Sequence, residues 1–112
     1  MARPHERMPV FAQLIRKAKK RGLHTVDVTA ADINTQWRAQ KGRCSLTGLP
    51  MTVVATSTNH TLLSVSLDRI EPSKGYTVGN TALVCTRANI MKGNMTPSQF
   101  AWMCRRVVTE EE

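Results

Sequence analysis

The sequence has few cysteines and no long apolar run. Its three cysteines, Cys44, Cys85 and Cys104, are odd in number and widely spaced, which argues against a disulfide framework and for a reducing compartment. No stretch approaches the roughly 20 apolar residues that a membrane span requires. Residues 1–9 are polar and lack the apolar segment of a signal peptide. The sequence therefore predicts a soluble cytoplasmic protein with no membrane partner.

Acidic residues are also scarce. The 112 residues hold 8 Asp and Glu against 16 Lys and Arg, which gives a formal net charge of +8, and residues 110–112 contain three of the acids. This balance favours a polyanionic partner such as DNA, because each cation near a phosphate releases condensed counterions. A solubilising basic surface would explain the same composition. The length predicts a single domain over residues 1–112.

The N-terminal part of the chain is predicted to be helical over residues 10–41, after a flexible arm at residues 1–9. Apolar residues recur at helical spacing over residues 10–21, and Gly22 ends this first helix. A second helix begins at Thr29, with an acid three residues later as in a capping box. It continues to about residue 41.

The end of the first helix is strongly cationic. Five of six residues carry positive charge there: Arg16, Lys17, Lys19, Lys20 and Arg21. Cations at the C-terminal end of a helix interact favourably with its macrodipole, so part of this cluster has a structural explanation. Five charges exceed what the helix end needs, and contact with DNA phosphates explains them equally well. The cluster is a predicted source of nonspecific affinity for the DNA backbone.

Residues 42–93 have the pattern of a small β-rich unit that ends in a helix. Two β-rich runs, 51–56 and 61–67, are separated by a polar stretch and predict a hairpin. Apolar and polar residues alternate in the second run, which places Asp68 on the polar face at the strand end. The unit continues with a predicted loop, strand and short helix over residues 71–79, 81–85 and 87–92.

A last helix is predicted over residues 96–109. Thr96 is a suitable N-cap, a proline follows it, and Gln99 stands at the third helical position. The apolar stripe of this helix, which includes Phe100 and Val107, is expected to pack against the rest of the protein.

Two oxygen-bearing side chains can meet where the predicted strand and short helix come together. Asp68 supplies a carboxylate and Asn89 an amide oxygen, and such hard ligands suit Mg²⁺ or Mn²⁺. A divalent ion in this position would polarise a phosphodiester. Lys92 lies about one helical turn after Asn89, so we expect it to reach the phosphate.

Three motifs follow one another in this region with short spacings. They are Asp68-Arg-Ile-Glu-Pro72, Gly79-Asn80 and Cys85-Thr-Arg-Ala-Asn89-Ile-Met-Lys92. In this order they resemble the HNH family of the His-Me finger (ββα-metal) nucleases, whose core reads roughly Asp-His-Ile-x-Pro, a Gly-containing loop with Asn, and Cys-x-x-Cys-Asn-x-x-Lys. Residues 40–50 are similar to a segment that precedes this core in small, phage-type members. A phage-encoded protein of this kind would act in the cytoplasm of the host cell.

The resemblance implies an α+β fold with a ββα-metal core between N-terminal and C-terminal helices. It also implies a metal-dependent DNA endonuclease, in which Asp68 and Asn89 bind Mg²⁺ or Mn²⁺ and Asn80 orders the catalytic loop. Arg69, Arg87 and Lys92 are the expected phosphate contacts of this core.

The chain departs from the family pattern at Arg69, which stands where the family has its general base, a His. An Arg side chain stays protonated in proteins and cannot take a proton from water near neutral pH. Two readings remain open. In the first, the protein cleaves DNA with another base while Arg69 grips the scissile phosphate, and the Glu71 carboxylate could be that base or a further metal ligand. In the second, the protein has lost cleavage and has retained DNA binding.

A second departure concerns zinc. Relatives with two Cys-x-x-Cys pairs hold a structural zinc, but here Thr47 and Ala88 replace the second cysteine of each pair. Two thiolates do not fill a tetrahedral site, so structural zinc is not expected and the cysteines are predicted to be small core residues.

The alternatives to an endonuclease are an inactive DNA-binding module on the same scaffold and a small inhibitor that binds a host protein.

Overall fold

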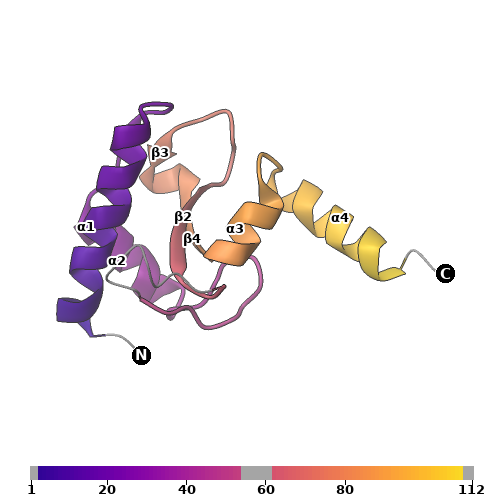
Figure 1. Ribbon diagram of the computed structural model, residues 1–112, viewed down its shortest axis with the longest axis horizontal. Helices are drawn as coiled ribbons and strands as arrows, with labels where there is room; N and C mark the ends of the chain where they lie inside the picture. Colours follow the sequence, from indigo (N-terminus) through magenta and orange to yellow (C-terminus); the bar gives the residue numbers. More distant parts are fainter. Residues whose placement is uncertain (1–2, 54–61, 110–112) are drawn as a thin grey trace.

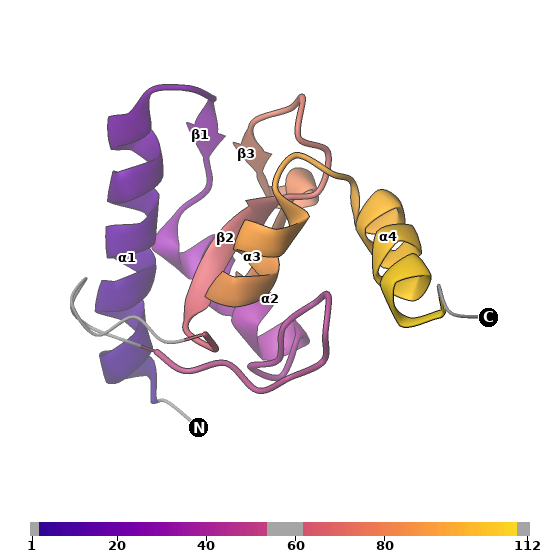
Figure 2. The same ribbon diagram turned by 45° about the vertical axis from the view of Figure 1, so that its right-hand side comes forward.

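The computed structural model describes residues 3–53 and 62–109, and these form an α+β structure (Figure 1). The helices and strands are α1 (Pro4–Arg21), β1 (Val26–Asp27), α2 (Ala30–Ala39), β2 (Val65–Arg69), β3 (Tyr76–Thr77), the 3₁₀ helix η2 (Val78–Asn80), β4 (Thr81–Cys85), α3 (Thr86–Lys92) and α4 (Pro97–Thr109). Strands β2 and β4 pair antiparallel, and β1 and β3 pair parallel. Helix α3 covers one side of the β2–β4 ribbon, and α1 and α2 lie on the other (Figures 1 and 2). The predicted fold class is confirmed.

The N-terminal helix begins earlier than the sequence predicted. Residues 4–9 were expected to be part of a flexible arm, but α1 begins at Pro4, a residue favoured at the first helical position. The early turns are held by tertiary contacts, since Arg7 is buried and its Nε donates a hydrogen bond of 2.6 Å to Asn34 Oδ1 on α2. No helix within residues 3–53 and 62–109 is both long and apolar enough to cross a membrane.

Helix α2 anchors the core beneath the ribbon. Its predicted N-cap is confirmed, because Thr29 and Asp32 exchange the two hydrogen bonds of a capping box at 2.9 and 3.1 Å. Ile33 and Trp37 are buried, and the Trp37 ring lies 5.8 Å from that of Phe11 on α1. These aromatic and aliphatic side chains fix the positions of α1 and α2 against each other.

The ββα unit has the predicted order of strand, loop, strand and short helix, and it consists of β2, β4 and α3. A hairpin over residues 51–56 and 61–67 was also predicted, and residues 54–61 of it lie outside the described residues. Within the described residues this prediction is wrong, because Thr52 forms only an isolated bridge with Ser64. Instead β2 pairs with β4, with Leu67 opposite Leu83. Every residue of β4 is buried, so this strand lies in the core, and β2 pairs with it along one edge.

The segment between β2 and β4 is also more ordered than a simple loop. It contains β3 and η2, and the Tyr76 N–H donates to Thr25 O at 2.8 Å, which joins it to the start of β1. This short parallel pairing ties the end of α1 to the loop that follows β2. The sequence did not predict it because a two-residue strand has no periodicity to detect.

Gly75→Ala tests the tightness of this junction and is expected to lower the free energy of unfolding by about 1–3 kcal/mol. A Cβ at Gly75 would lie 2.6 Å from Thr25 O, which is too close for the backbone to remain in place. Urea unfolding measures the loss. Gly79→Ala in the same segment is the matched control, because a Cβ there meets nothing within 4 Å. Equal losses in the two variants would contradict the predicted crowding at Gly75.

Helix α4 begins as predicted but does not pack as predicted. Thr96 and Gln99 exchange two capping hydrogen bonds at 2.9 and 3.2 Å. Phe100 is buried, whereas Met103 is 45% and Val107 is 69% exposed. Figure 1 shows the reason, since α4 projects from the body of the protein and only its first turns lie near α3. The expected packing role therefore holds for the start of the helix alone.

Candidate metal and nucleic-acid site

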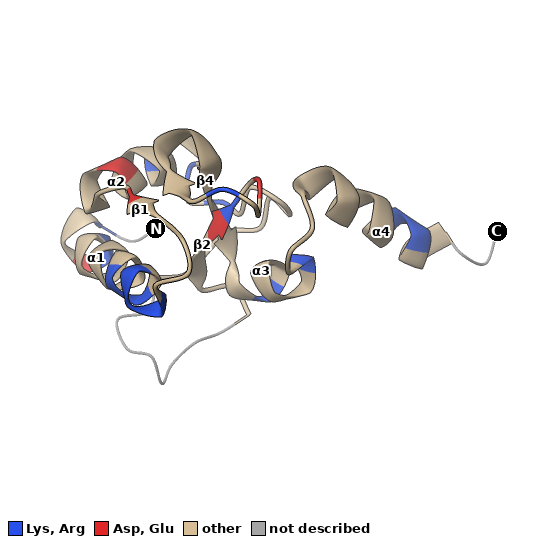
Figure 3. Cartoon of the chain, turned by 90° about the horizontal axis from the view of Figure 1, so that it is seen from above, with Lys and Arg blue, Asp and Glu red and all other residues tan. Residues whose placement is uncertain are grey.

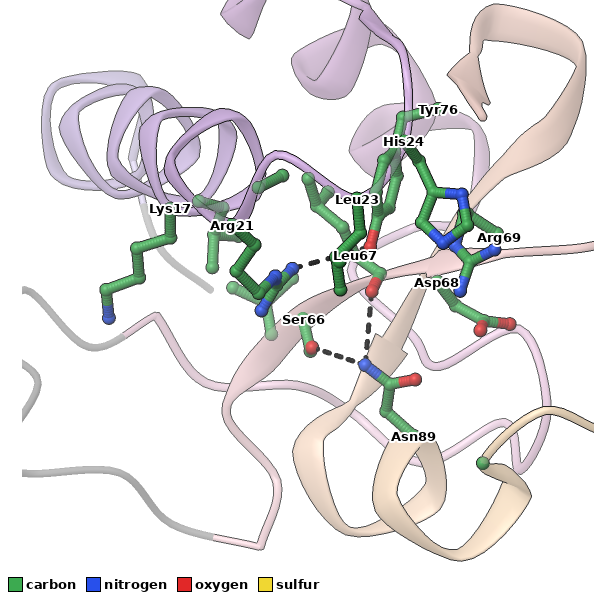
Figure 4. A pocket seen from close by; sticks show the side chains of 14 residues that line it. Lys17, Arg21, Leu23, His24, Ser66, Leu67, Asp68, Arg69, Tyr76 and Asn89 are labelled. Atoms are coloured by element: carbon green, nitrogen blue, oxygen red, sulfur yellow. Dashed lines mark hydrogen bonds between the residues drawn. The ribbon is translucent and has the colours of Figure 1, made fainter. Parts of the chain in front are cut away.

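The side chains expected to carry chemistry surround a cleft of about 370 Å³ between the end of α1, strand β2 and helix α3 (Figure 4). The polar and charged residues that line it are Lys17, Arg21, His24, Ser66, Asp68, Arg69, Tyr76 and Asn89. Three separate parts of the chain supply them. The cleft is thus a product of tertiary structure, although the sequence predicted several of its members.

Asp68 lies near the end of β2, and its carboxylate is almost entirely removed from solvent while still lining the cleft. Its Oδ1 is 3.1 Å from Lys92 Nζ. Burial raises the pKa of the Asp68 carboxyl, and the nearby Lys92 ammonium and Arg69 guanidinium offset part of that rise by favouring the ionised form. The side chain is therefore a desolvated carboxylate, held in place by one buried cation.

Lys92 is placed differently from the sequence prediction. Its side chain is fully buried, and Nζ donates hydrogen bonds to Asp68 Oδ1 at 3.1 Å and to the Arg69 carbonyl at 3.2 Å. An ammonium enclosed in this way cannot also meet a DNA phosphate. The expected phosphate contact of Lys92 is therefore wrong, because a buried charge needs an internal partner and Asp68 is that partner.

Asn89 projects from α3 toward β2. Its Nδ2 donates to Ser66 Oγ at 2.7 Å and to the Leu67 carbonyl at 3.1 Å. Since both bonds use the amide nitrogen, the Oδ1 atom is turned away from these partners (Figure 4). These two acceptors of β2 fix the orientation of the Asn89 amide. The amide oxygen of Asn89 therefore remains as a hydrogen-bond acceptor or ligand toward the cleft.

Asn80 crosslinks the loop that follows β2. Its Oδ1 accepts the Glu71 N–H at 2.8 Å, and its Nδ2 donates to the carbonyls of Gly75 and Glu71 at 2.8 and 3.2 Å. The side chain is buried at the end of η2. This geometry is what a loop-ordering residue requires, and any catalytic consequence stays a prediction.

Arg69 lines the cleft, but its guanidinium is held by the same loop. Nη1 donates to the carbonyls of Pro72 and Lys74, the latter at 3.4 Å. The guanidinium carbon also lies 5.8 Å from the centre of the Tyr76 ring, a cation–π distance. Arg69 therefore stabilises the loop in this structure. That its remaining N–H donors bind the scissile phosphate stays a prediction.

The predicted cationic cluster is divided by the fold. Lys17 and Arg21 line the cleft, and Arg21 Nη2 is 3.4 Å from the Tyr76 hydroxyl. Arg16, Lys19 and Lys20 are on α1 outside the cleft wall and exposed. Figure 3 shows these cations gathered toward the C-terminal end of α1.

The other two predicted residues lie away from the cleft. Glu71, the candidate base, turns toward its own loop, where Oε1 accepts from Ser73 N and Oγ at 3.3 and 3.1 Å. Arg87 is exposed on α3 and borders a separate apolar groove beside α4. Neither side chain joins Asp68 and Asn89 in the cleft.

Sequence reasoning missed His24 and Tyr76, which both line the cleft. His24 stands in the α1–β1 connection, far in sequence from Asp68, and Tyr76 stands in β3, between the motifs at residues 68–72 and 79–80. No local pattern distinguishes either residue, and the β1–β3 pairing brings His24 to the site beside Tyr76.

The donor set of the cleft fits a divalent ion that keeps most of its waters. Asp68 supplies a carboxylate and Asn89 an amide oxygen, and Mg²⁺ is bound in proteins by one or two carboxylates with water and substrate phosphate. Within residues 3–53 and 62–109 no group of three or more His, Cys, Asp or Glu side chains could enclose a metal ion.

The cysteines were predicted to be small core residues. Cys44 and Cys85 are buried among apolar side chains, whereas Cys104 is half-exposed on α4.

No protein-family model matches this sequence, and no curated protein matches it either. A solved structure does match: that of PacI, described as a rare-cutting HNH restriction endonuclease. The similarity has a TM-score of 0.65 at 19% sequence identity and covers 88% of this chain and 73% of that chain. The chain has an HNH-like fold. The HNH-like fold confirms the predicted resemblance at the level of architecture, with β2, β4 and α3 as its ββα unit.

Proposed function

We propose that this protein is a metal-dependent DNA endonuclease of the HNH type that acts in the cytoplasm. The observation that carries the proposal is the convergence of the Asp68 carboxylate and the Asn89 amide oxygen on one cleft of an HNH-like fold. A desolvated carboxylate beside an oriented amide is the donor pair expected for Mg²⁺ or Mn²⁺. An ion held there would polarise the scissile phosphate and stabilise the leaving oxygen.

The residues of the chain have separate tasks in this proposal. Lys17 and Arg21 form a cationic wall of the cleft and attract the DNA backbone, while the exposed Lys19 and Lys20 extend this field along α1. Asn80 and Arg69 hold the loop that frames the cleft through its carbonyls and N–H groups. The proposal that DNA is the polymer is supported by the net charge and by the description of PacI as a restriction endonuclease.

A plasmid assay tests the proposal directly. Supercoiled DNA incubated with the purified protein is expected to be nicked or linearised with Mg²⁺ or Mn²⁺ and to remain intact with EDTA. Agarose gels at several salt concentrations measure the rate, which should fall steeply as salt rises, since phosphate contacts release counterions. A folded protein that binds DNA but leaves plasmid and single-stranded DNA intact would contradict the enzymatic proposal.

The second candidate is a DNA-binding module without cleavage, and the state of Arg69 favours it. The position of the family's base holds a guanidinium that is tied to Pro72 and Lys74 carbonyls and cannot accept a proton. If this candidate is correct, wild type binds DNA without cutting it, and Arg69→His gains metal-dependent cleavage. Metal-dependent cleavage of DNA by the wild-type protein would exclude it.

A further inference from the structure

His24 reaches the cleft from an element that the ββα unit does not include. It lies in the connection between α1 and β1, and it lines the same cleft as Asp68 and Asn89. Figure 4 draws the imidazole, the Arg69 guanidinium and the Asp68 carboxylate around this one space. A side chain with proton-accepting capacity therefore stands in the cleft although position 69 lacks one.

The backbone that carries His24 is fixed on both sides. Helix α1 is capped at its C-terminal end by Gly22, whose left-handed conformation (φ 67°) turns the chain and whose N–H donates to Lys19 O at 3.1 Å. On the other side, Thr25 O accepts the Tyr76 N–H at 2.8 Å, and β1 pairs with β3. His24 is thus held against the segment that Asn80 and Arg69 brace, and this rigidity suits a group that must meet a substrate.

The His24 side chain has no competing task in the part of the chain that the structure describes. Its ring is half-buried, and no hydrogen bond or ion pair engages it among those residues. A histidine that serves the core is normally satisfied by a polar partner. An unengaged imidazole at the wall of a cationic cleft is instead available to water or substrate.

The other candidates for a proton acceptor are each occupied. The Asp68 carboxylate is paired with Lys92 and is the proposed metal ligand. Glu71 accepts two hydrogen bonds from Ser73 and does not line the cleft. The Tyr76 hydroxyl lies 3.4 Å from the Arg21 guanidinium. Imidazole is also the side chain most often used as a general base near neutral pH.

We propose that His24 is the general base of this nuclease and replaces, from a different element, the imidazole that position 69 lacks. The inference rests on the proposed endonuclease function. An imidazole nitrogen of His24 takes one proton from the attacking water as the water oxygen bonds to phosphorus. The P–O bond to the leaving oxygen breaks, this oxygen keeps the electron pair and is protonated by solvent, and the imidazolium returns its proton to solvent.

His24→Ala and His24→Gln test the proposal on the full chain, with His5→Ala as the matched control, because His5 lies on α1 with its side chain 73% exposed. Plasmid nicking by both His24 variants is expected to slow by about 10²- to 10⁴-fold, while His5→Ala retains the wild-type rate. DNA affinity by fluorescence anisotropy, Mn²⁺ affinity by electron paramagnetic resonance and the unfolding temperature should all remain at wild-type values. Added imidazole should restore part of the rate to His24→Ala, since the truncated side chain leaves room for it.

Each other outcome is decisive. A wild-type nicking rate in both His24 variants overturns the role of His24 and leaves the endonuclease proposal standing. Loss of Mn²⁺ affinity would make His24 a metal ligand, and loss of DNA affinity would make it a phosphate contact, so either result overturns its role as base. A wild-type protein that binds DNA but is inert with every metal overturns the endonuclease proposal and the inference together.

Discussion

Asp68→Asn is expected to lose measurable Mn²⁺ affinity and to slow DNA cleavage by about 10³-fold or more, since a bound ion contributes several kcal/mol to the transition state. The substitution removes the charge that a divalent ion needs. It keeps a side-chain oxygen at the position of Oδ1, where Lys92 Nζ donates at 3.1 Å. The buried ammonium therefore retains an acceptor, so the loss should reflect chemistry and not unfolding.

The measurements for Asp68→Asn are Mn²⁺ titration, plasmid nicking and thermal unfolding of the same preparations. Asp27→Asn is the matched control, because this carboxylate is exposed on β1 and lies outside the cleft. The control should behave as wild type in all three measurements. Unchanged Mn²⁺ affinity in Asp68→Asn would remove the carboxylate from the metal site and with it the main support for the proposed function.

Lys92→Met is expected to lower the free energy of unfolding by about 3–5 kcal/mol, which is the usual cost of leaving one charge of a buried pair without its partner. Lys92 is 1% exposed, and its ammonium is the cation nearest to the Asp68 carboxylate. Methionine has a similar length and fills the same space, so the loss reports on charge and hydrogen bonding more than on packing.

The pH dependence of Lys92→Met has a definite sign. Burial already raises the pKa of Asp68 above its ordinary value of 3.8, and Lys92 opposes that rise. Without Lys92 the pKa of Asp68 rises further. The contribution of Asp68 to the stability of the variant is therefore most favourable below pH 3.8, where Asp68 is neutral in both states, and is lost as pH rises through the folded-state pKa. Mn²⁺ binding needs the ionised form, and its midpoint should therefore shift to higher pH.

A double-mutant cycle separates stability from function at this pair. Asp68→Leu/Lys92→Met replaces both charges by apolar groups and is expected to recover most of the stability lost in Lys92→Met. It should still lack Mn²⁺ affinity and nicking, because the ligand oxygen is gone. Urea unfolding at neutral pH measures the coupling. A double variant as unstable as Lys92→Met would show that the ion pair is not the source of the loss.

Elements with strong local signals were well predicted. The strand over residues 81–85 and the capping of α2 and α4 agree with the structure, because a run of apolar and β-branched residues and an N-cap are signals between neighbours in the chain. The start of α1 was missed, since Arg7 and its partner Asn34 stabilise the early turns from 27 positions apart. The predicted hairpin failed for a similar reason, because the partner of β2 is chosen by burial of β4 and not by nearness in sequence.

The site divides in the same way. The sequence by itself determined a candidate ligand pair, Asp68 and Asn89, and the absence of a base at position 69, because motif order and side-chain chemistry are written in the chain. Only the tertiary structure decided that Lys92 pairs with Asp68 inside the protein and that His24 lines the cleft. Both results depend on burial and on the β1–β3 pairing, which are properties of distant segments brought together.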